Sequence, residues 1–172
     1  QRLAAALDAE CERIDVLVNN AGAIFNRYET TADGLERTFA LNHLSYFLLT
    51  HLLLDLLKAS APARIINVSS AAHIPSRLQM DDLQNERSYT GWKAYSRSKL
   101  MNLYFTYELA RRLEGSGVTA NALHPGYVAT NFGKSNGGFF QPLFRFLHLA
   151  AIPPQEGARA SIYLASSPEV EG

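Results

Sequence analysis

The sequence predicts an α/β fold in which a doubly wound parallel sheet carries helices on both faces. Three short apolar runs rich in β-branched residues, at residues 14–18, 64–69 and 118–123, have the length and composition of buried strands. Helical segments separate them, and strands joined by helical crossovers pair in parallel with right-handed connections. We therefore expect one partial domain over residues 1–172.

Four helices are expected around these strands. The first covers residues 3–12, and the second runs from N-cap candidates at residues 31–33 to about Ala59. The third spans residues 93–113, before a glycine-containing turn, and the last spans residues 156–165. The order helix, strand, helix, strand, helix, strand, helix is typical of an open α/β sheet.

Composition excludes several classes of function. Of the 172 residues, 47% are hydrophobic, and the 16 basic residues balance the 16 acidic ones, so no net charge attracts nucleic acid. A single cysteine excludes an internal disulfide, and the five histidines share no metal-ligand spacing, so no metal site is expected. Residues 41–57 are too polar to span a bilayer. We expect a cytoplasmic protein.

Polar residues and glycines follow each expected strand. Because the carboxyl ends of parallel strands meet at one edge of the sheet, where ligands bind in such folds, these residues should converge on one site. They are Asn19, Asn20, Ala21 and Gly22 after the first strand, Ser69 and Ser70 at the end of the second, and His124, Pro125 and Gly126 after the third.

Tyr95 and Lys99 lie four residues apart on the third helix and therefore share one of its faces. A phenol with a pKa of about 10 transfers protons poorly at neutral pH, whereas a neighbouring ammonium favours the phenolate. Such a pair on a solvated helix is also common without any catalytic role. Its meaning depends on its neighbours.

Two further polar residues have both a functional and a structural interpretation. Ser70 can polarise a substrate oxygen or satisfy backbone groups at the strand end. Since successive strand residues point to opposite faces, only one of Ser69 and Ser70 should face the site. Asn42 lies inside an apolar helix, an unfavourable position unless its side chain has a function or bonds a neighbouring backbone group.

Taken in order, these motifs resemble the short-chain dehydrogenase/reductase family over nearly the whole chain. They are Asn19-Asn20-Ala21-Gly22, the helical Asn42, Val68-Ser69-Ser70, Tyr95 with Lys99, and Pro125-Gly126 followed by Thr130. The resemblance implies a Rossmann-type fold, of which this chain would be the catalytic C-terminal portion.

The resemblance implies a role for each motif. Tyr95 would be the general acid and base, Ser70 would orient the carbonyl, and Asn42 would support a proton-relay water. Lys99 would hold the nicotinamide ribose and lower the pKa of Tyr95. The turn of Asn19, Asn20, Ala21 and Gly22 would lie against the adenosine side of the cofactor, and Pro125, Gly126 and Thr130 would lie along the nicotinamide.

The subgroup can be narrowed by the polar insert at residues 73–91. Together with the sequences around Arg111-Arg112 and His124-Pro125, it resembles retinol-dehydrogenase-like members. This implies NADP(H) in preference to NAD(H), and a lipophilic aldehyde, ketone or alcohol as substrate. In this family the helices at residues 33–59 and 93–113 commonly pair between subunits, which implies a homo-oligomer.

The glycine-rich phosphate-binding turn and the first strands of the family pattern are absent from the sequence. We therefore expect a chain truncated at the N-terminus and slightly at the C-terminus, which binds NADPH poorly. The strand at residues 14–18 is expected to have an unpaired, aggregation-prone edge.

Residues 130–155 are rich in aromatic residues and glycines and have three interpretations. They are predicted to form a lid over a lipophilic substrate, with docking to a membrane surface or simple packing against the fold as alternatives.

Besides an oxidoreductase, two other functions remain open for the whole chain. One is a non-catalytic dinucleotide-binding protein, and the other is an epimerase or dehydratase with the same Tyr–Lys chemistry.

Overall fold

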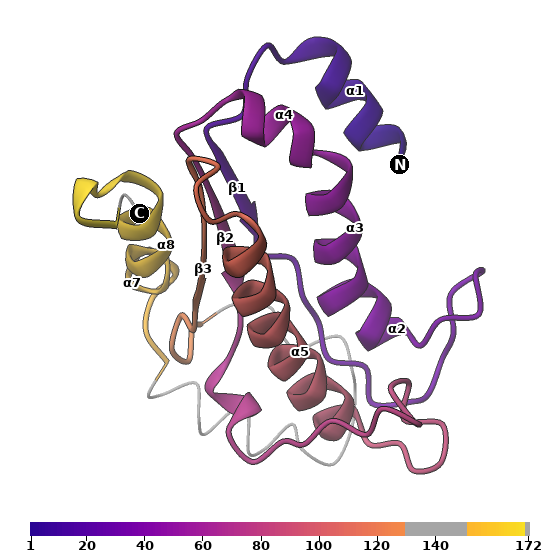
Figure 1. Cartoon of the computed structure of the whole chain (residues 1–172). Coiled ribbons are helices and arrows are strands. Elements are labelled where there is room, and N and C mark those ends of the chain that lie inside the picture. Colours follow the sequence, from indigo (N-terminus) through magenta and orange to yellow (C-terminus); the bar gives the residue numbers. More distant parts are fainter. Residues whose placement is uncertain (130–150, 171–172) are drawn as a thin grey trace.

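Three parallel strands form the sheet of the computed structural model, which describes residues 1–129 and 151–170 (Figure 1). They are β1 (Val16–Asn19), β2 (Ala63–Val68) and β3 (Val118–Leu123), in the order β1-β2-β3. Asn19 lies beside Asn67, and Val68 lies beside Leu123, so all three strands end at the same edge. The predicted parallel α/β fold is confirmed.

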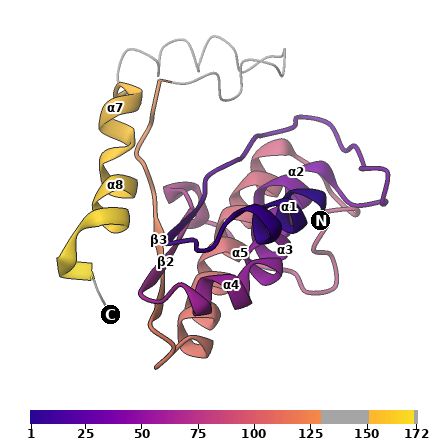
Figure 2. The same ribbon diagram turned by 90° about the horizontal axis from the view of Figure 1, so that it is seen from above.

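Helices cover both faces of this sheet, as a doubly wound fold requires (Figure 2). The helices α4 and α5 pack on one face, while α8 packs on the other, where Arg64 of β2 donates to the carbonyl of Leu164 at 3.0 Å. The helices are α1 (Arg2–Glu10), α2 (Arg37–Phe39), α3 (Ser45–Leu52), α4 (Leu54–Ala59), α5 (Gly91–Arg112), α7 (Pro154–Gly157) and α8 (Arg159–Ser166), with 3-10 turns at Ala71–His73 and Pro168–Val170.

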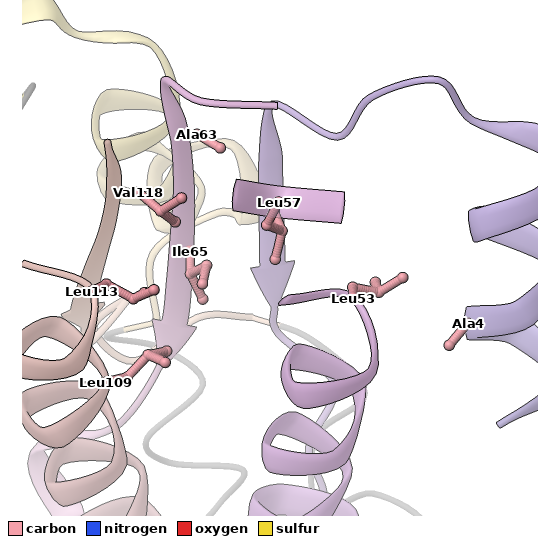
Figure 3. Close-up of a cluster of buried hydrophobic side chains, with 8 residues drawn as sticks. All are labelled: Ala4, Leu53, Leu57, Ala63, Ile65, Leu109, Leu113 and Val118. Carbon is pink, nitrogen blue, oxygen red and sulfur yellow. The ribbon is translucent and has the colours of Figure 1, made fainter. Parts of the chain in front are cut away.

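The main hydrophobic core lies between the sheet and the layer of α4 and α5 (Figure 3). Alternate residues of β2, Ala63 and Ile65, contribute to it because strand side chains alternate between faces. Leu57 of α4 and Leu109 of α5 belong to the same cluster and cover this face of the sheet. This packing fixes α5, which carries Tyr95 and Lys99, against the ends of the strands.

The second helix departs from the prediction of one continuous helix that starts at residues 31–33. It begins at Arg37, because the buried carboxylate of Glu36 caps it by accepting from the backbone N–H groups of Thr38 and Phe39 at 2.7 and 2.8 Å. The helix then passes through a π-turn at Ala40–Leu44 and breaks at Leu53 before α4.

The other elements differ from their predicted bounds by small amounts. The helix α5 begins at Gly91 rather than at residue 93, since the side chain of Thr90 accepts from the N–H of Lys93. A Cβ at Gly91 would lie 2.5 Å from the carbonyl oxygen of Phe25, so only glycine fits there. The last predicted helix consists of α7 and α8, which meet at Ala158.

Within the described ranges, 1–129 and 151–170, no helix combines the length and the apolar character that a bilayer crossing requires.

Candidate functional site

The site lies where β2 ends beside the N-terminal half of α5. Ser70, two residues after Val68, lies close enough to Tyr95, on the first turns of α5, for its side chain to favour the phenolate. The Nζ atom of Lys99 lies 5.7 Å from the centre of the Tyr95 ring. The structure therefore brings these three predicted residues together at the carboxyl edge of the sheet.

Ser69 and Ser70 both approach α5 but make different contacts with it. Ser69 is buried, and its hydroxyl donates to the backbone carbonyl of Lys99 at 2.7 Å. Ser70 is only half-buried; besides contacting Tyr95, its hydroxyl accepts from the N–H of Ala72 at 3.2 Å and so begins the 3-10 turn. The structural interpretation of Ser70 is therefore supported, while its action on a substrate oxygen stays a prediction.

The electrostatics of Tyr95 differ from those expected from the sequence. Burial raises the pKa of Tyr95, and the hydrogen bond from Ser70 opposes this increase only in part. Burial also lowers the pKa of Lys99 to about 8, and its ammonium group donates to the carbonyl of Val68 at 2.9 Å. The net direction of the Tyr95 pKa is therefore upward, opposite to the expected decrease, because desolvation of the phenol outweighs the groups that favour its charged form.

A second tyrosine flanks the same lysine. The ring centre of Tyr46, in α3, also lies 5.7 Å from Lys99 Nζ. The Tyr46 hydroxyl, however, donates to the carbonyl of Ala21 at 2.9 Å, and burial raises its pKa. Tyr46 thus holds the loop after β1 in place, whereas Tyr95 contacts a hydroxyl at the strand end.

Asn42 is fully buried in the π-turn, and its side chain clamps the loop after β1. Its Oδ1 accepts from the N–H of Ala23 and its Nδ2 donates to the carbonyl of the same residue, both at 2.9 Å. Nδ2 also lies 3.0 Å from the hydroxyl of Ser98, to which it donates. This agrees with the structural interpretation of Asn42, while its role with a relay water stays a prediction.

The loop predicted to contact the adenosine side contains one buried side chain. Asn19 points into the protein, where its amide donates to Thr50 Oγ1 and Asn67 Oδ1 at 3.0 and 2.8 Å. The residues Asn20, Ala21 and Gly22 are exposed. Asn19 therefore anchors the loop from below, and the next three residues lie at its surface.

On the third strand end, Gly126 has a φ of +81°, which favours glycine. Its N–H donates to Nδ1 of His124, and Pro125 between them is half-buried. Thr130 and residues 130–150 of the predicted lid lie outside the described residues. The described part of the predicted lid, residues 151–155, begins beside the chain that follows β3, since Ile152 forms a parallel bridge with Val128.

Sequence reasoning missed a line of buried polar residues along α5. Ser98, Asn102 and Thr106 are spaced by four residues, which is the repeat of one helix face, and all three are buried. Asn67 of β2 joins them, since its amide donates to Thr106 Oγ1 at 2.9 Å. This spacing of polar residues within a core helix is the signal that could have identified them.

The predicted insert at residues 73–91 is anchored on α5 by a buried arginine. Arg97 donates to the carbonyl of Asp82 and to Oδ1 of Asn85, at 3.2 and 2.6 Å, and to Gln79 Oε1 at 2.5 Å. Because Arg97 lies between Tyr95 and Lys99 in the sequence, these bonds hold the insert beside the helix that carries both residues.

Comparison with known proteins identifies similar sequences. A family model described as short chain dehydrogenase matches residues 1–138. The chain is 55% identical to human "Retinol dehydrogenase 14" over 93% of its own length and 48% of that protein. It is 47% identical to human "Retinol dehydrogenase 13" over 99% of its length and 53% of that protein. It thus spans about half the length of the curated relatives that it matches.

Solved structures show the same fold. The "Pseudomonas aeruginosa RhlG/NADP active-site complex" matches with a TM-score of 0.74 and 29% identity, over 99% of this chain and 66% of that one. A putative uncharacterized protein from Mycobacterium paratuberculosis matches with a TM-score of 0.73 and 40% identity, over 95% of this chain and 54% of that one.

Proposed function

The chain belongs to the short-chain dehydrogenase family, and on this premise we propose that it carries the proton-transfer residues of an oxidoreductase. The reaction is hydride transfer between a nicotinamide dinucleotide and a carbonyl or alcohol. The observation that carries the proposal is the approach of Ser70 to Tyr95 beside the buried Lys99, whose Nζ lies 5.7 Å from the centre of the Tyr95 ring. A phenol, a hydroxyl and an ammonium at one strand edge are the groups that this reaction needs from the protein.

The residues fit a nicotinamide dinucleotide. The Lys99 ammonium has three N–H donors, of which Val68 O accepts one, so the others can donate to ribose hydroxyl groups. A Cβ built on Gly22 would lie 3.4 Å from Lys99 Nζ, so the loop after β1 lies close to the ammonium group. The cofactor supplies or accepts the hydride when it is bound.

The protein moves the proton. During reduction, Tyr95 donates its phenolic proton to the carbonyl oxygen, while the Ser70 hydroxyl donates a hydrogen bond to the same oxygen and orients it. The positive charge of Lys99 favours the phenolate that remains, although burial opposes it. During oxidation the phenolate removes the alcohol proton.

We further propose NADP(H) as the cofactor and a lipophilic substrate. The similarity to "Retinol dehydrogenase 14" and to the RhlG complex, which is named as a complex with NADP, supports these choices. Trp92 supports a lipophilic substrate. Its side chain is 55% exposed, one helical turn before Tyr95, and the centres of the two rings lie 6.1 Å apart. It offers an apolar surface beside the phenol.

A substrate panel tests this function. Protein expressed from the complete coding sequence is assayed with retinaldehyde and with aliphatic aldehydes of increasing length, with NADPH and with NADH. The proposal is supported by turnover that decreases the absorbance of the reduced nicotinamide and becomes faster as the aldehyde becomes longer. An isomerised or dehydrated product without net cofactor oxidation favours an epimerase or dehydratase. Failure of all substrates with both cofactors favours a non-catalytic protein.

Replacement of Trp92 by alanine should reduce kcat/KM for long aldehydes by roughly tenfold and leave the shortest aldehyde nearly unaffected. The expected dependence on length follows from the 6.1 Å between the centres of the Trp92 and Tyr95 rings, which separates the indole from a carbonyl bound at the phenol. Trp92→Phe should recover most of the loss. The control is Tyr163→Ala, which removes an exposed aromatic ring on α8, outside the surface of α3 and α5. Equal losses for short and long aldehydes would contradict a substrate role for Trp92.

We also propose a homo-oligomer that uses the outer surface of α3 and α5. Phe47 and Leu48 of α3, and Tyr104 and Tyr107 of α5, are large apolar residues that are 43 to 66% exposed. Such a surface is typical of a subunit interface. Light scattering should therefore give at least twice the monomer mass, and Tyr107→Glu should reduce it. A monomeric wild-type protein would contradict this proposal.

A further inference from the structure

Asn102 lies at the centre of α5 and is completely buried, yet each polar group of its side chain has a partner. Its amide Nδ2 donates to the backbone carbonyl of Asn42 at 2.8 Å. Its Oδ1 lies 3.0 Å from Nδ1 of His43, and because a carbonyl oxygen cannot donate, His43 is the donor. Asn102 therefore contacts two consecutive residues of the π-turn through both ends of its amide.

The π-turn at Ala40–Leu44 receives its side-chain donors from two sides. Its wider hydrogen bond runs from the N–H of Ser45 to the carbonyl of Ala40. The hydroxyl of Ser45 then donates to the carbonyl of Leu41 at 2.6 Å, and Asn102 donates to the next carbonyl, that of Asn42. Of these two side chains, Asn102 is the one that ties the turn to another helix.

The position of Asn42 determines what lies next to Lys99. The Asn42 side chain holds both backbone groups of Ala23 at 2.9 Å. A Cβ built on the preceding Gly22 would lie 3.4 Å from Asn42 Oδ1 and 3.4 Å from Lys99 Nζ. The loop, the amide of Asn42 and the ammonium are thus packed against one another. A displacement of the π-turn displaces this loop from Lys99.

We propose that Asn102 is a positioning residue: its amide fixes the π-turn so that Asn42 holds the loop at residues 22–23 against Lys99. It contacts neither cofactor nor substrate. Its effect on turnover rests on the proposed function, whereas its effect on the π-turn does not. Loss of the donor would leave the buried carbonyl of Asn42 without this partner, which favours rearrangement of the turn.

The test is Asn102→Asp, compared with Thr106→Val. The aspartate keeps the volume and the acceptor for His43 but replaces the N–H donor to Asn42 O by an oxygen. Thr106→Val is the matched control one turn along α5. It removes the bonds of Thr106 Oγ1 to the carbonyl of Asn102 and to Asn67, and leaves the Asn102 amide intact. A role limited to stability would give both variants the same phenotype.

Two measurements are made on protein expressed from the complete coding sequence. In crystal structures, Asn102→Asp should lose the bonds between Asn42 and Ala23, whereas Thr106→Val should keep them. In turnover assays, Asn102→Asp should reduce kcat by roughly 10- to 100-fold, with a smaller change in the KM of the carbonyl substrate, whereas Thr106→Val should keep kcat within about threefold.

The two measurements separate this inference from the proposed function. Bonds between Asn42 and Ala23 that persist in the Asn102→Asp crystal structure overturn the positioning role, whatever the activity. If those bonds are lost and kcat is unchanged, the claim that the loop acts on Lys99 is wrong. A wild-type protein without redox turnover refutes the proposed function, and the crystal structures still decide the role of Asn102 in the turn.

Discussion

Replacement of Tyr95 by phenylalanine should abolish measurable turnover while nicotinamide cofactor binding is largely retained. The phenol is the proposed proton donor, and loss of a positioned general acid costs roughly 10²- to 10⁴-fold in rate. The phenylalanine ring preserves the contact with Trp92 and most of the buried volume. The variant therefore removes the hydroxyl that contacts Ser70 and leaves the surrounding packing intact.

On protein expressed from the complete coding sequence, the measurements are kcat with the best aldehyde of the panel and the Kd for NADPH from fluorescence. Tyr104→Phe is the matched control, since it removes a phenolic hydroxyl from an exposed position on the same helix and should leave kcat unchanged. Tyr46 is the alternative phenol near Lys99. Substantial residual kcat in Tyr95→Phe would refute Tyr95 as the proton donor and make Tyr46 the candidate for that role.

The second large effect is expected for Lys99→Met, which should lose activity and gain stability. The ammonium is the proposed ribose ligand, so kcat/KM should fall by roughly 10²-fold or more. The gain in stability follows from burial, which lowers the pKa of Lys99 from its ordinary value of 10.5 to about 8. At about 1.4 kcal/mol per pH unit, the buried charge costs the folded state about 3 kcal/mol.

The sign of the pH dependence follows from proton binding. Below about pH 8 the lysine is charged in both the folded and the unfolded chain, so wild type bears the whole cost. Between about 8 and 10.5 the folded chain loses the proton first and the unfolded chain binds more protons. The contribution of Lys99 to the free energy of unfolding of the wild-type protein therefore increases with pH over that range. The advantage of the methionine variant should shrink accordingly.

Denaturant unfolding at about pH 7 and about pH 10 measures this difference. At the lower pH, Lys99→Met should be more stable by about 2 kcal/mol, because the lost hydrogen bond to Val68 O offsets about 1 kcal/mol of the gain. Lys93→Met, at a less buried position on the same helix, is the matched control and should leave activity unchanged. A Lys99→Met variant that is less stable at both pH values would contradict the cost assigned to the buried charge.

Local sequence patterns were sufficient for the order of the elements and for the strands. The β-branched runs, separated by helical segments, predicted three parallel strands, and the parallel sheet confirms them. The first residue of the second helix could not be predicted from the sequence in the same way. Thr31 and Asp33 are good N-cap residue types, but Thr31 caps a turn by accepting from the N–H groups of Asp33 and Leu35. The actual cap, Glu36, is a buried carboxylate held in addition by Tyr89.

What the sequence by itself determined is the fold class, the family and the set of candidate residues. These depend on residue type, periodicity and short spacings, which are properties of the linear chain. The tertiary structure alone decided that Tyr95 contacts Ser70, that its pKa is raised and not lowered, and that Asn42 bonds Ala23. Those outcomes depend on desolvation and on distances between residues 19 or more positions apart in the chain, and only packing sets these quantities.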